Sequence, residues 1–316
     1  MRSLSQLRLT GGWIFLFLLC FIVLFPVSAE AAHDHAGVFL QLGHGARGPA
    51  LANAVAARAE GSLAARYNPA GLATLETGRI QMSVGEKALD VEQGDVTLSW
   101  PASSSGSALT VQYLDYGRED RVEIGTDGSP RREGTFSSHD FAIGFARGSK
   151  AGKLNGWDLS WGWGFRLLRL NVDNVYAHTV SGELGGYSVS PSGSNRIGVV
   201  FRNFGPEAEF DERSEPLPYL LRFGIARRLF VEDWGKAWLI IEGENRRFDK
   251  TSEFAAVELE ILERLALRAG YDGRTDLSDR LRFGLGLNFP VGNFDYAYLP
   301  GGDLGDNHRF SIEVKF

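Results

Sequence analysis

Residues 157–167 read Trp-Asp-Leu-Ser-Trp-Gly-Trp-Gly-Phe-Arg-Leu, and this stretch decides the fold. Every second residue from Trp157 is aromatic or aliphatic, while the residues between them are Asp, Ser, Gly and Arg. Such alternation is typical of a β-strand between an apolar and a polar environment, because successive side chains point to opposite faces. The pattern recurs at residues 255–261, 280–289 and 309–316, so the sequence predicts an extended β-sheet.

We expect about fourteen segments of this kind, most of them close to the ~9–11 residues that a tilted membrane strand needs. They are residues 79–87, 94–101, 107–116, 135–146, 157–170, 176–189, 195–203, 219–230, 236–248, 253–262, 264–271, 279–289, 293–299 and 308–316. The predicted fold is therefore all-β: an antiparallel, up-and-down transmembrane barrel formed by residues 79–316.

The composition agrees with a β-rich exported protein. The 316 residues include 39 glycines and 44% hydrophobic residues, and the mean hydropathy of −0.13 is too low for a bundle of membrane helices. A net charge of −6 argues against a nucleic-acid partner, because such proteins normally carry a basic patch.

The N-terminus predicts export. Arg2 and Arg8 precede a continuous apolar run at residues 13–25, and small residues follow at Val27-Ser28-Ala29. This is the pattern of a signal peptide, predicted here as residues 1–29. Cys20 lies inside it and is the only cysteine, so the mature chain would have neither disulfides nor thiol chemistry.

Residues 30–78 differ from the rest and predict an N-terminal plug. They are rich in alanine, with Pro49 at a plausible first turn and Leu51, Val55 and Leu63 spaced for a short α-helix. The segment ends in Tyr67-Asn68-Pro69-Ala70-Gly71-Leu72. Asn68, Pro69, Ala70 and Gly71 could form a gate, or could simply be the turn that leads the chain into its first strand.

Two observations favour a membrane barrel over a soluble β-sandwich. The polar faces of the strands combine glycine with charges of both signs, which suits an aqueous lumen crossed by ion pairs. The predicted lumen charges are Arg166, Arg202, Arg222, Glu258, Glu260, Arg268 and Arg282, with Glu242 and Glu313 beside them. The connections also alternate between short turns and long loops, the longest being residues 117–134 and 204–218, with the connection at 147–156 as an exception.

The last strand carries a third signal. Phe310, Ile312, Val314 and the terminal Phe316 share one face, as in the C-terminal signal that barrel-insertion machinery recognises. Together these features predict that the protein lies in the outer membrane of a Gram-negative cell, in contact with its lipid.

Several motifs, taken in order, resemble the PorV/PorQ family, which belongs to the wider FadL-like barrel superfamily. Residues 42–47 and 67–72 resemble the start of these proteins, and residues 134–142, 200–205 with 217–218, and 267–271 are similar to later motifs. The resemblance implies a fourteen-stranded barrel with a plug in its lumen.

The resemblance leaves two functions open. PorV is a component of type IX secretion, so the first is a secretion-accessory role with partners at residues 117–134 and 204–218. FadL-like proteins pass hydrophobic compounds through a gated lumen, so the alternative is a channel with an apolar pocket near Val38, Phe39, Leu40 and Leu42. Because residues 117–134 are charged and glycine-rich, the sequence favours the accessory role.

The residues offer little for catalysis. Ser137-Ser138-His139-Asp140 contains the residue types of a hydrolase site, but neighbours on a strand point to opposite faces and cannot act together. His33 and His35 follow the predicted cleavage point, where a tail is a simpler explanation than a metal cluster with His44. We therefore expect no enzyme activity, no metal and no cofactor.

Overall fold

The computed structural model describes residues 35–86, 91–126, 128–211, 213–231, 234–247, 251–274, 280–302 and 305–316. The predicted signal peptide at residues 1–29 and the first residues of the predicted plug, 30–34, lie outside the described residues.

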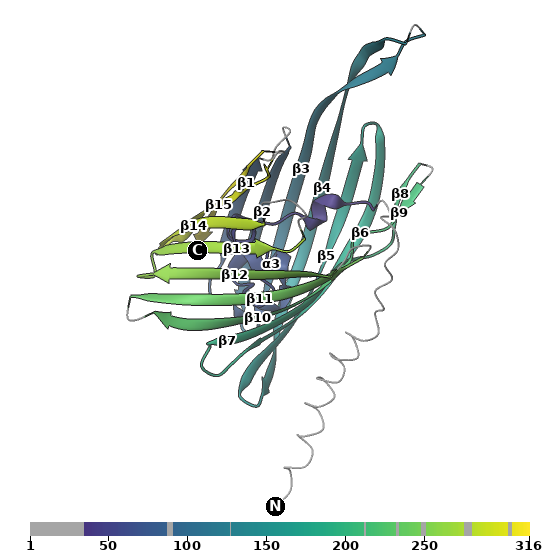
Figure 1. Cartoon of the computed structure of the whole chain (residues 1–316). Helices are drawn as coiled ribbons and strands as arrows, with labels where there is room; N and C mark the ends of the chain where they lie inside the picture. The colour runs from purple at the N-terminus through teal and green to yellow at the C-terminus, as the bar shows by residue number, and fades with distance from the viewer. Residues whose placement is uncertain are drawn as a thin grey trace, which may run out of the picture.

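In the described part of the chain, fourteen strands close into one antiparallel barrel (Figure 1). Strands that follow one another in the sequence are hydrogen-bonded neighbours, and the barrel closes between β1 and β16, from Arg79 opposite Lys315 to Glu86 opposite His308. The strands β8 and β9 form a separate two-stranded sheet within the connection between β7 and β10. The predicted fold class is therefore confirmed.

Each predicted segment overlaps one barrel strand. The strands are β1 (Arg79–Glu86), β2 (Glu92–Ala102), β3 (Ser105–Ile124), β4 (Pro130–Leu154), β5 (Trp157–Val172), β6 (Val175–Val189), β7 (Asn195–Phe204), β8 (Ala208–Phe210), β9 (Arg213–Glu215), β10 (Leu220–Val231), β11 (Gly235–Arg246), β12 (Ser252–Ile261), β13 (Leu265–Asp272), β14 (Leu281–Phe289), β15 (Gly292–Leu299) and β16 (Asn307–Lys315).

Two predicted connections were wrong. Much of residues 117–134 is strand, because β3 and β4 stay paired from Arg118 and Ser137 to Ile124 and Pro130, and this hairpin rises beyond the rest of the barrel (Figure 1). Residues 147–156 are not a loop either, since β4 continues to Leu154 and turns at Asn155 and Gly156, both with positive φ. A ribbon exposed on both faces can carry charges on both, so it lacks the alternation that marks the other strands.

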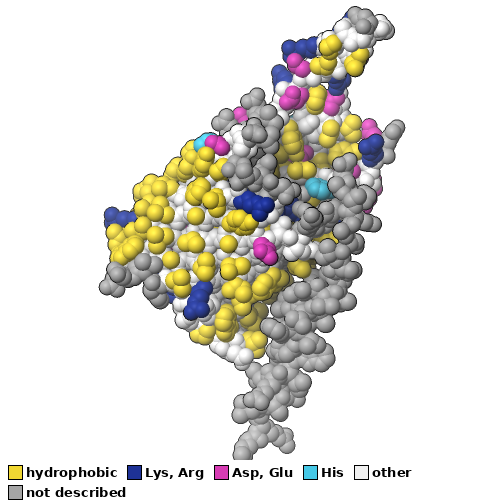
Figure 2. Space-filling view, in the orientation of Figure 1, with side chains coloured by type: hydrophobic (Ala, Val, Ile, Leu, Met, Phe, Trp, Pro, Cys, Tyr) yellow, Lys and Arg dark blue, Asp and Glu magenta, His cyan; other side chains and the backbone are white. Residues whose placement is uncertain are grey.

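The two faces of the wall have opposite chemistry. Leu167, Ile241 and Ile312 are 59%, 59% and 55% exposed on the outside, and Figure 2 shows hydrophobic side chains covering the outer face over the strands around β11. Arg166 and Glu258, one residue away from such positions, are buried inside. This reversal, with apolar residues outside and charges inside, is that of a barrel surrounded by lipid.

The N-terminal segment lies within the ring of strands as short helical pieces: η1 (Val38–Gln41), α2 (Arg47–Ala50), η2 (Gly61–Leu63), α3 (Ala64–Tyr67) and η3 (Pro69–Thr74). The short α-helical character predicted for this segment is present, but no single helix runs through Leu51, Val55 and Leu63. Ala52 and Asn53 have φ of 53° and 61°, and Gly61 has φ of 61°, so the backbone leaves the helical region at both places. Within the described residues, no helix is both long and apolar enough to cross a bilayer.

The barrel has two distinct ends. The β3–β4, β5–β6 and β7–β10 connections lie at what we call the long-hairpin end, and β1 starts and β16 finishes at the short-turn end.

Candidate functional site: the plugged lumen

A set of inward-facing glycines brings the N-terminal segment, called the plug from here on, against the wall. A β-carbon at Gly162 or Gly198 would lie closer than 3.0 Å to backbone atoms of Ala70 or Ala56. The same holds on other strands, and we call this set the glycine seat: Gly106, Gly148, Gly162, Gly198 and Gly270. The plug backbone therefore packs on the wall with no side chain between them.

Asn68 anchors the plug to this seat. Its side-chain oxygen accepts a hydrogen bond from the Ala70 amide at 3.2 Å and so caps η3. Its amide nitrogen donates to the carbonyl oxygens of Ala56 and of Gly186 on β6, both at 3.0 Å. Pro69, Ala70 and Gly71 are buried within η3, which leads toward β1. Asn68 is thus both a helix cap and a contact between plug and wall.

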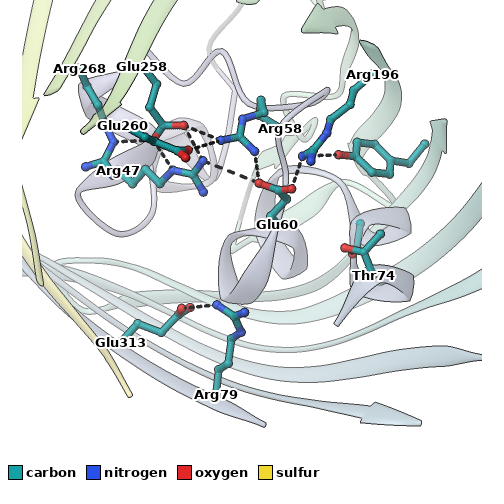
Figure 3. Close-up of polar contacts among 12 residues, drawn as sticks. Arg47, Arg58, Glu60, Thr74, Arg79, Arg196, Glu258, Glu260, Arg268 and Glu313 are labelled. Carbon is teal, nitrogen blue, oxygen red and sulfur yellow. Dashed lines mark hydrogen bonds and ion pairs between the residues drawn. The ribbon is translucent and has the colours of Figure 1, made fainter. Parts of the chain in front are cut away.

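An ionic network joins the plug to the strands β7, β12 and β13 of the wall (Figure 3). Glu258 of β12 accepts hydrogen bonds at 2.8 Å from Arg47 and Arg58 of the plug and from Arg268 of β13. The plug residue Glu60 pairs with Arg58 and with Arg196 of β7. We call this network the ionic latch: Arg47, Arg58, Glu60, Arg196, Glu258, Glu260 and Arg268.

The latch forms one wall of a cavity of about 1160 Å³ at the short-turn end, which we call the vestibule. Trp238 is among the lining residues and is flanked by guanidinium groups, with the carbons of Arg58 and Arg196 at 4.1 Å and 4.5 Å from its ring centre. Most of the remaining lining is charged or polar, including Lys236, Glu263, Arg264, Glu313 and Lys315. Charged side chains therefore make up much of the vestibule lining.

Toward the long-hairpin end of the barrel, the first helical piece of the plug lies in an apolar interior. Phe39 and Leu40 of η1 are 0% and 1% exposed and pack with inward-facing leucines of the wall. We call this group the apolar layer: Phe39, Leu40, Leu114, Leu168, Leu170 and Leu217. Of the predicted pocket residues, Phe39 and Leu40 lie in it and Leu42 packs against it, but Val38 is 50% exposed.

Between the apolar layer and the seat lies a group of buried cations. Arg66 of α3 donates from Nε to Nε2 of His44 at 2.6 Å and from Nη2 to Gln112 at 3.1 Å. Arg166 and Arg202 both lie near Glu183, at 3.6 Å and 3.7 Å. Burial and the positive charges of Arg166 and Arg202 lower the pKa of Arg66. We call Arg66, Arg166, Arg202 and Glu183 the cationic cluster.

The predicted lumen charges do not form a single site. Arg166 and Arg202 belong to the cationic cluster, and Glu258, Glu260 and Arg268 to the latch. Arg222 pairs with Glu242 and Glu244, while Arg282 is buried near the carbonyl oxygen of Pro300.

The predicted insertion signal faces outward. Phe310, Ile312 and Val314 are 43%, 55% and 44% exposed on β16, and Phe316 is 71% exposed with its amide bonded to the Gly78 carbonyl oxygen.

Several interior residues were missed from the sequence. Arg66, Asp95 and Glu183 were not singled out, and His44 was considered only as part of a metal cluster; all four are buried in the lumen. Asp95 and Glu183 lie on the inward face of strands that were correctly predicted, so strand parity could have identified them. The two plug residues could not be placed that way, because the plug has no regular period.

His44 and Glu60 are further plug residues whose pKa values are shifted. Burial and the charge of Arg66 lower the pKa of His44 to about 3, although Asp95 opposes this shift. His44 is therefore neutral, with Nε2 free to accept the bond from Arg66. Burial disfavours the charged form of Glu60, but Arg58 and Arg196 outweigh it and lower its pKa.

Comparison with known proteins supports the fold. No family model and no curated protein sequence matches the chain. Among solved structures, the Ralstonia pickettii toluene transporter TbuX matches with a TM-score of 0.60 and 12% identity, over 88% of this chain and 100% of its own. The P. putida toluene transporter TodX matches with a TM-score of 0.52 and 13% identity, over 87% of this chain and 99% of its own. A Pseudomonas aeruginosa FadL homologue matches with a TM-score of 0.50 and 11% identity, over 85% of this chain and 97% of its own. These neighbours are FadL-family outer-membrane barrels, and none gives evidence for PorV or PorQ specifically.

Proposed function

We propose that this protein is a plugged, passive channel that lets hydrophobic small molecules cross the outer membrane. The observation that carries the proposal is the apolar layer, since inward-facing leucines are unexpected in a lumen that otherwise carries charge. The side chains of the layer are at most 2% exposed, so a compound would contact them only after η1 moves aside. An apolar compound would then gain free energy by leaving water for the uncovered leucines. The outward apolar face and the outer-membrane neighbours support this location, with residues 1–29 as the export signal.

The structural neighbours also support a channel. Two of them are named toluene transporters, and a third is named a monoaromatic hydrocarbon channel, with a TM-score of 0.52. These names favour the channel over the secretion-accessory role that the sequence favoured.

The accessory role keeps one observation of its own, the β3–β4 hairpin. It carries ion pairs between Arg132 and Asp120 and between Arg121 and Asp173 of the β5–β6 turn. Its outer part is exposed on both faces, so it is accessible to a protein partner.

One experiment separates the two roles. Gram-negative cells would express the full chain or a variant in which a short turn replaces residues 118–136. Uptake of a hydrophobic probe such as toluene and release of secreted proteins would be measured in the same cultures. We expect the full chain to accelerate uptake, and the truncated chain to keep this activity. A chain that never accelerates uptake would overturn the channel, and loss of secretion on truncation would restore the accessory role.

A further inference from the structure

The two rims of the outer barrel face carry different aromatic side chains. On β5, Trp157 and Trp161 lie toward the short-turn end. The outward-facing tyrosines of the described residues all lie toward the long-hairpin end, and we call them the tyrosine belt: Tyr113, Tyr176, Tyr219, Tyr271, Tyr296 and Tyr298. Tyrosine and tryptophan gather where a membrane meets water, so the tyrosine belt marks the level of the lipid headgroups at that end.

Arginines lie over part of the tyrosine belt. Measured from the guanidinium carbon to the ring centre, the pairs are Arg169 over Tyr176 at 4.6 Å, Arg247 over Tyr219 at 5.4 Å and Arg280 over Tyr271 at 6.0 Å. Arg280 also donates a hydrogen bond to Oη of Tyr271 at 2.8 Å. A cation over an aromatic ring is attracted by the negative face of the ring, which helps to hold the side chain in place. Positive charge is therefore held at headgroup level on several sides of the barrel.

Arg169 is the most open of these cations. It is exposed on the outer face of β5, whereas Arg247 and Arg280 are partly buried. His178 of β6 lies directly opposite Arg169 in the strand register and is also exposed. No carboxylate of the described residues forms an ion pair with Arg169. A basic side chain at a membrane surface is attracted to anionic lipid, so the missing negative charge can come from the membrane itself.

An apolar surface continues from Arg169 toward the middle of the wall. Leu167, the next outward residue on β5, is 59% exposed, and Phe165 follows at 40%. Because the short turns of an outer-membrane barrel face the periplasm, the tyrosine belt lies in the outer leaflet. The main lipid of that leaflet in Gram-negative cells is a phosphorylated glycolipid, which has an anionic headgroup above its acyl chains.

We propose that Arg169, with His178 and Tyr176 beside it, binds a phosphate of this glycolipid. Guanidinium suits phosphate because two of its N–H groups can bind two phosphate oxygens at once. The acyl chains of the same lipid lie on the apolar surface formed by Leu167 and Phe165. The site depends on the outer-membrane location and not on conduction through the lumen.

The test compares two forms of one lipid. The full chain, purified in detergent, is mixed with lipid A carrying its phosphates or with the same lipid A after phosphatase treatment, and bound lipid is counted by native mass spectrometry. We expect the phosphorylated form to bind at a lower added concentration. Arg169→Gln should raise the concentration needed for half occupancy by roughly fivefold, the effect of one basic residue at a membrane surface. Arg227→Gln is the matched control, because Arg227 is also an exposed outward arginine, on β10 toward the short-turn end.

Three results would overturn the lipid site. The first is equal binding of both lipid forms by the unaltered chain, a comparison that holds even if Arg169→Gln does not fold. The second is an equal loss in Arg169→Gln and Arg227→Gln, which would mean general charge attraction. The third is displacement of lipid A by inorganic phosphate at the same concentration, which would mean a site for the free ion. Arg169→Lys keeps the charge and should retain most of the binding.

Discussion

The apolar layer and the vestibule lie in one lumen but have opposite chemistry. The first consists of leucines and a phenylalanine with almost no exposed surface, and the second of paired arginines and glutamates around a cavity of about 1160 Å³. The part of the plug on the glycine seat lies between them, and η1 of the plug itself belongs to the apolar layer. The difference shows that the interior is not uniform: its side chains are apolar toward the long-hairpin end and mostly charged at the short-turn end.

The largest expected effect comes from removing that separation. Gly198→Val places side-chain atoms where the Ala56 carbonyl lies, and backbone cannot move aside as a flexible side chain can. The overpacking should destabilise the seated plug by about 1–3 kcal/mol. The ratio of displaced to seated plug should then rise by roughly ten- to hundredfold. Single-channel conductance in a planar bilayer should rise. Gly243→Val is the control, because nothing lies within 4 Å of a β-carbon there. Equal conductance of both variants would show that the plug does not seal the lumen.

The next effect tests the apolar layer. Leu168→Asn places an unpaired amide among apolar side chains, at a cost of about 1–3 kcal/mol to any apolar solute that must pass. Uptake of toluene should fall by up to roughly a hundredfold. Leu167→Asn changes the neighbouring residue, which is 59% exposed on the outer face, and should leave uptake per folded barrel unchanged. If the two variants transport equally, the solute does not contact the layer.

A smaller effect is expected from the ionic latch. Glu60→Gln removes a carboxylate that pairs with Arg58 and Arg196. Because the Glu60 side chain is 31% exposed, we expect a loss of only about 1 kcal/mol in plug docking. Amide hydrogen exchange at residues 64–67 should quicken accordingly. Glu263→Gln, at an exposed pair with Lys236 on the vestibule rim, is the control. Unaltered exchange in Glu60→Gln would mean that the latch does not hold the plug.

The smallest effect is that of pH on the same docking. His44 has a pKa of about 3 when buried and 6.5 when released, so the released plug binds more protons between these values. Docking therefore weakens as pH falls below 6.5, by about 1 kcal/mol between pH 6.5 and 5.5. Exchange at residues 64–67 should quicken over this range, and His44→Gln should flatten the dependence. A steeper dependence in His44→Gln than in the parent chain would contradict this assignment.

The sequence predicts the wall of the barrel far better than its contents. Alternation located every barrel strand because successive residues face lipid and lumen in turn, and these two environments favour different side chains. It failed at the β3–β4 hairpin, where both faces meet water. Alternation also identified the latch charges on β12 and β13, but not their plug partners Arg58 and Glu60. Arg58 and Glu258 are 200 residues apart in the sequence, and no local pattern links residues so distant.

The plug precedes every barrel strand in the sequence, yet α2 packs against β13, β14 and β15, which are among the last strands to be synthesised. These contacts have no partner until the C-terminal strands are in place. During synthesis there is therefore a stage at which α2 has no partner strands, although η3 already has its partners on β3 to β6. Because the glycine seat draws on strands from β3 to β13, the plug cannot be fully seated before β13 is in place, and a seat mutation should act at this late step of assembly.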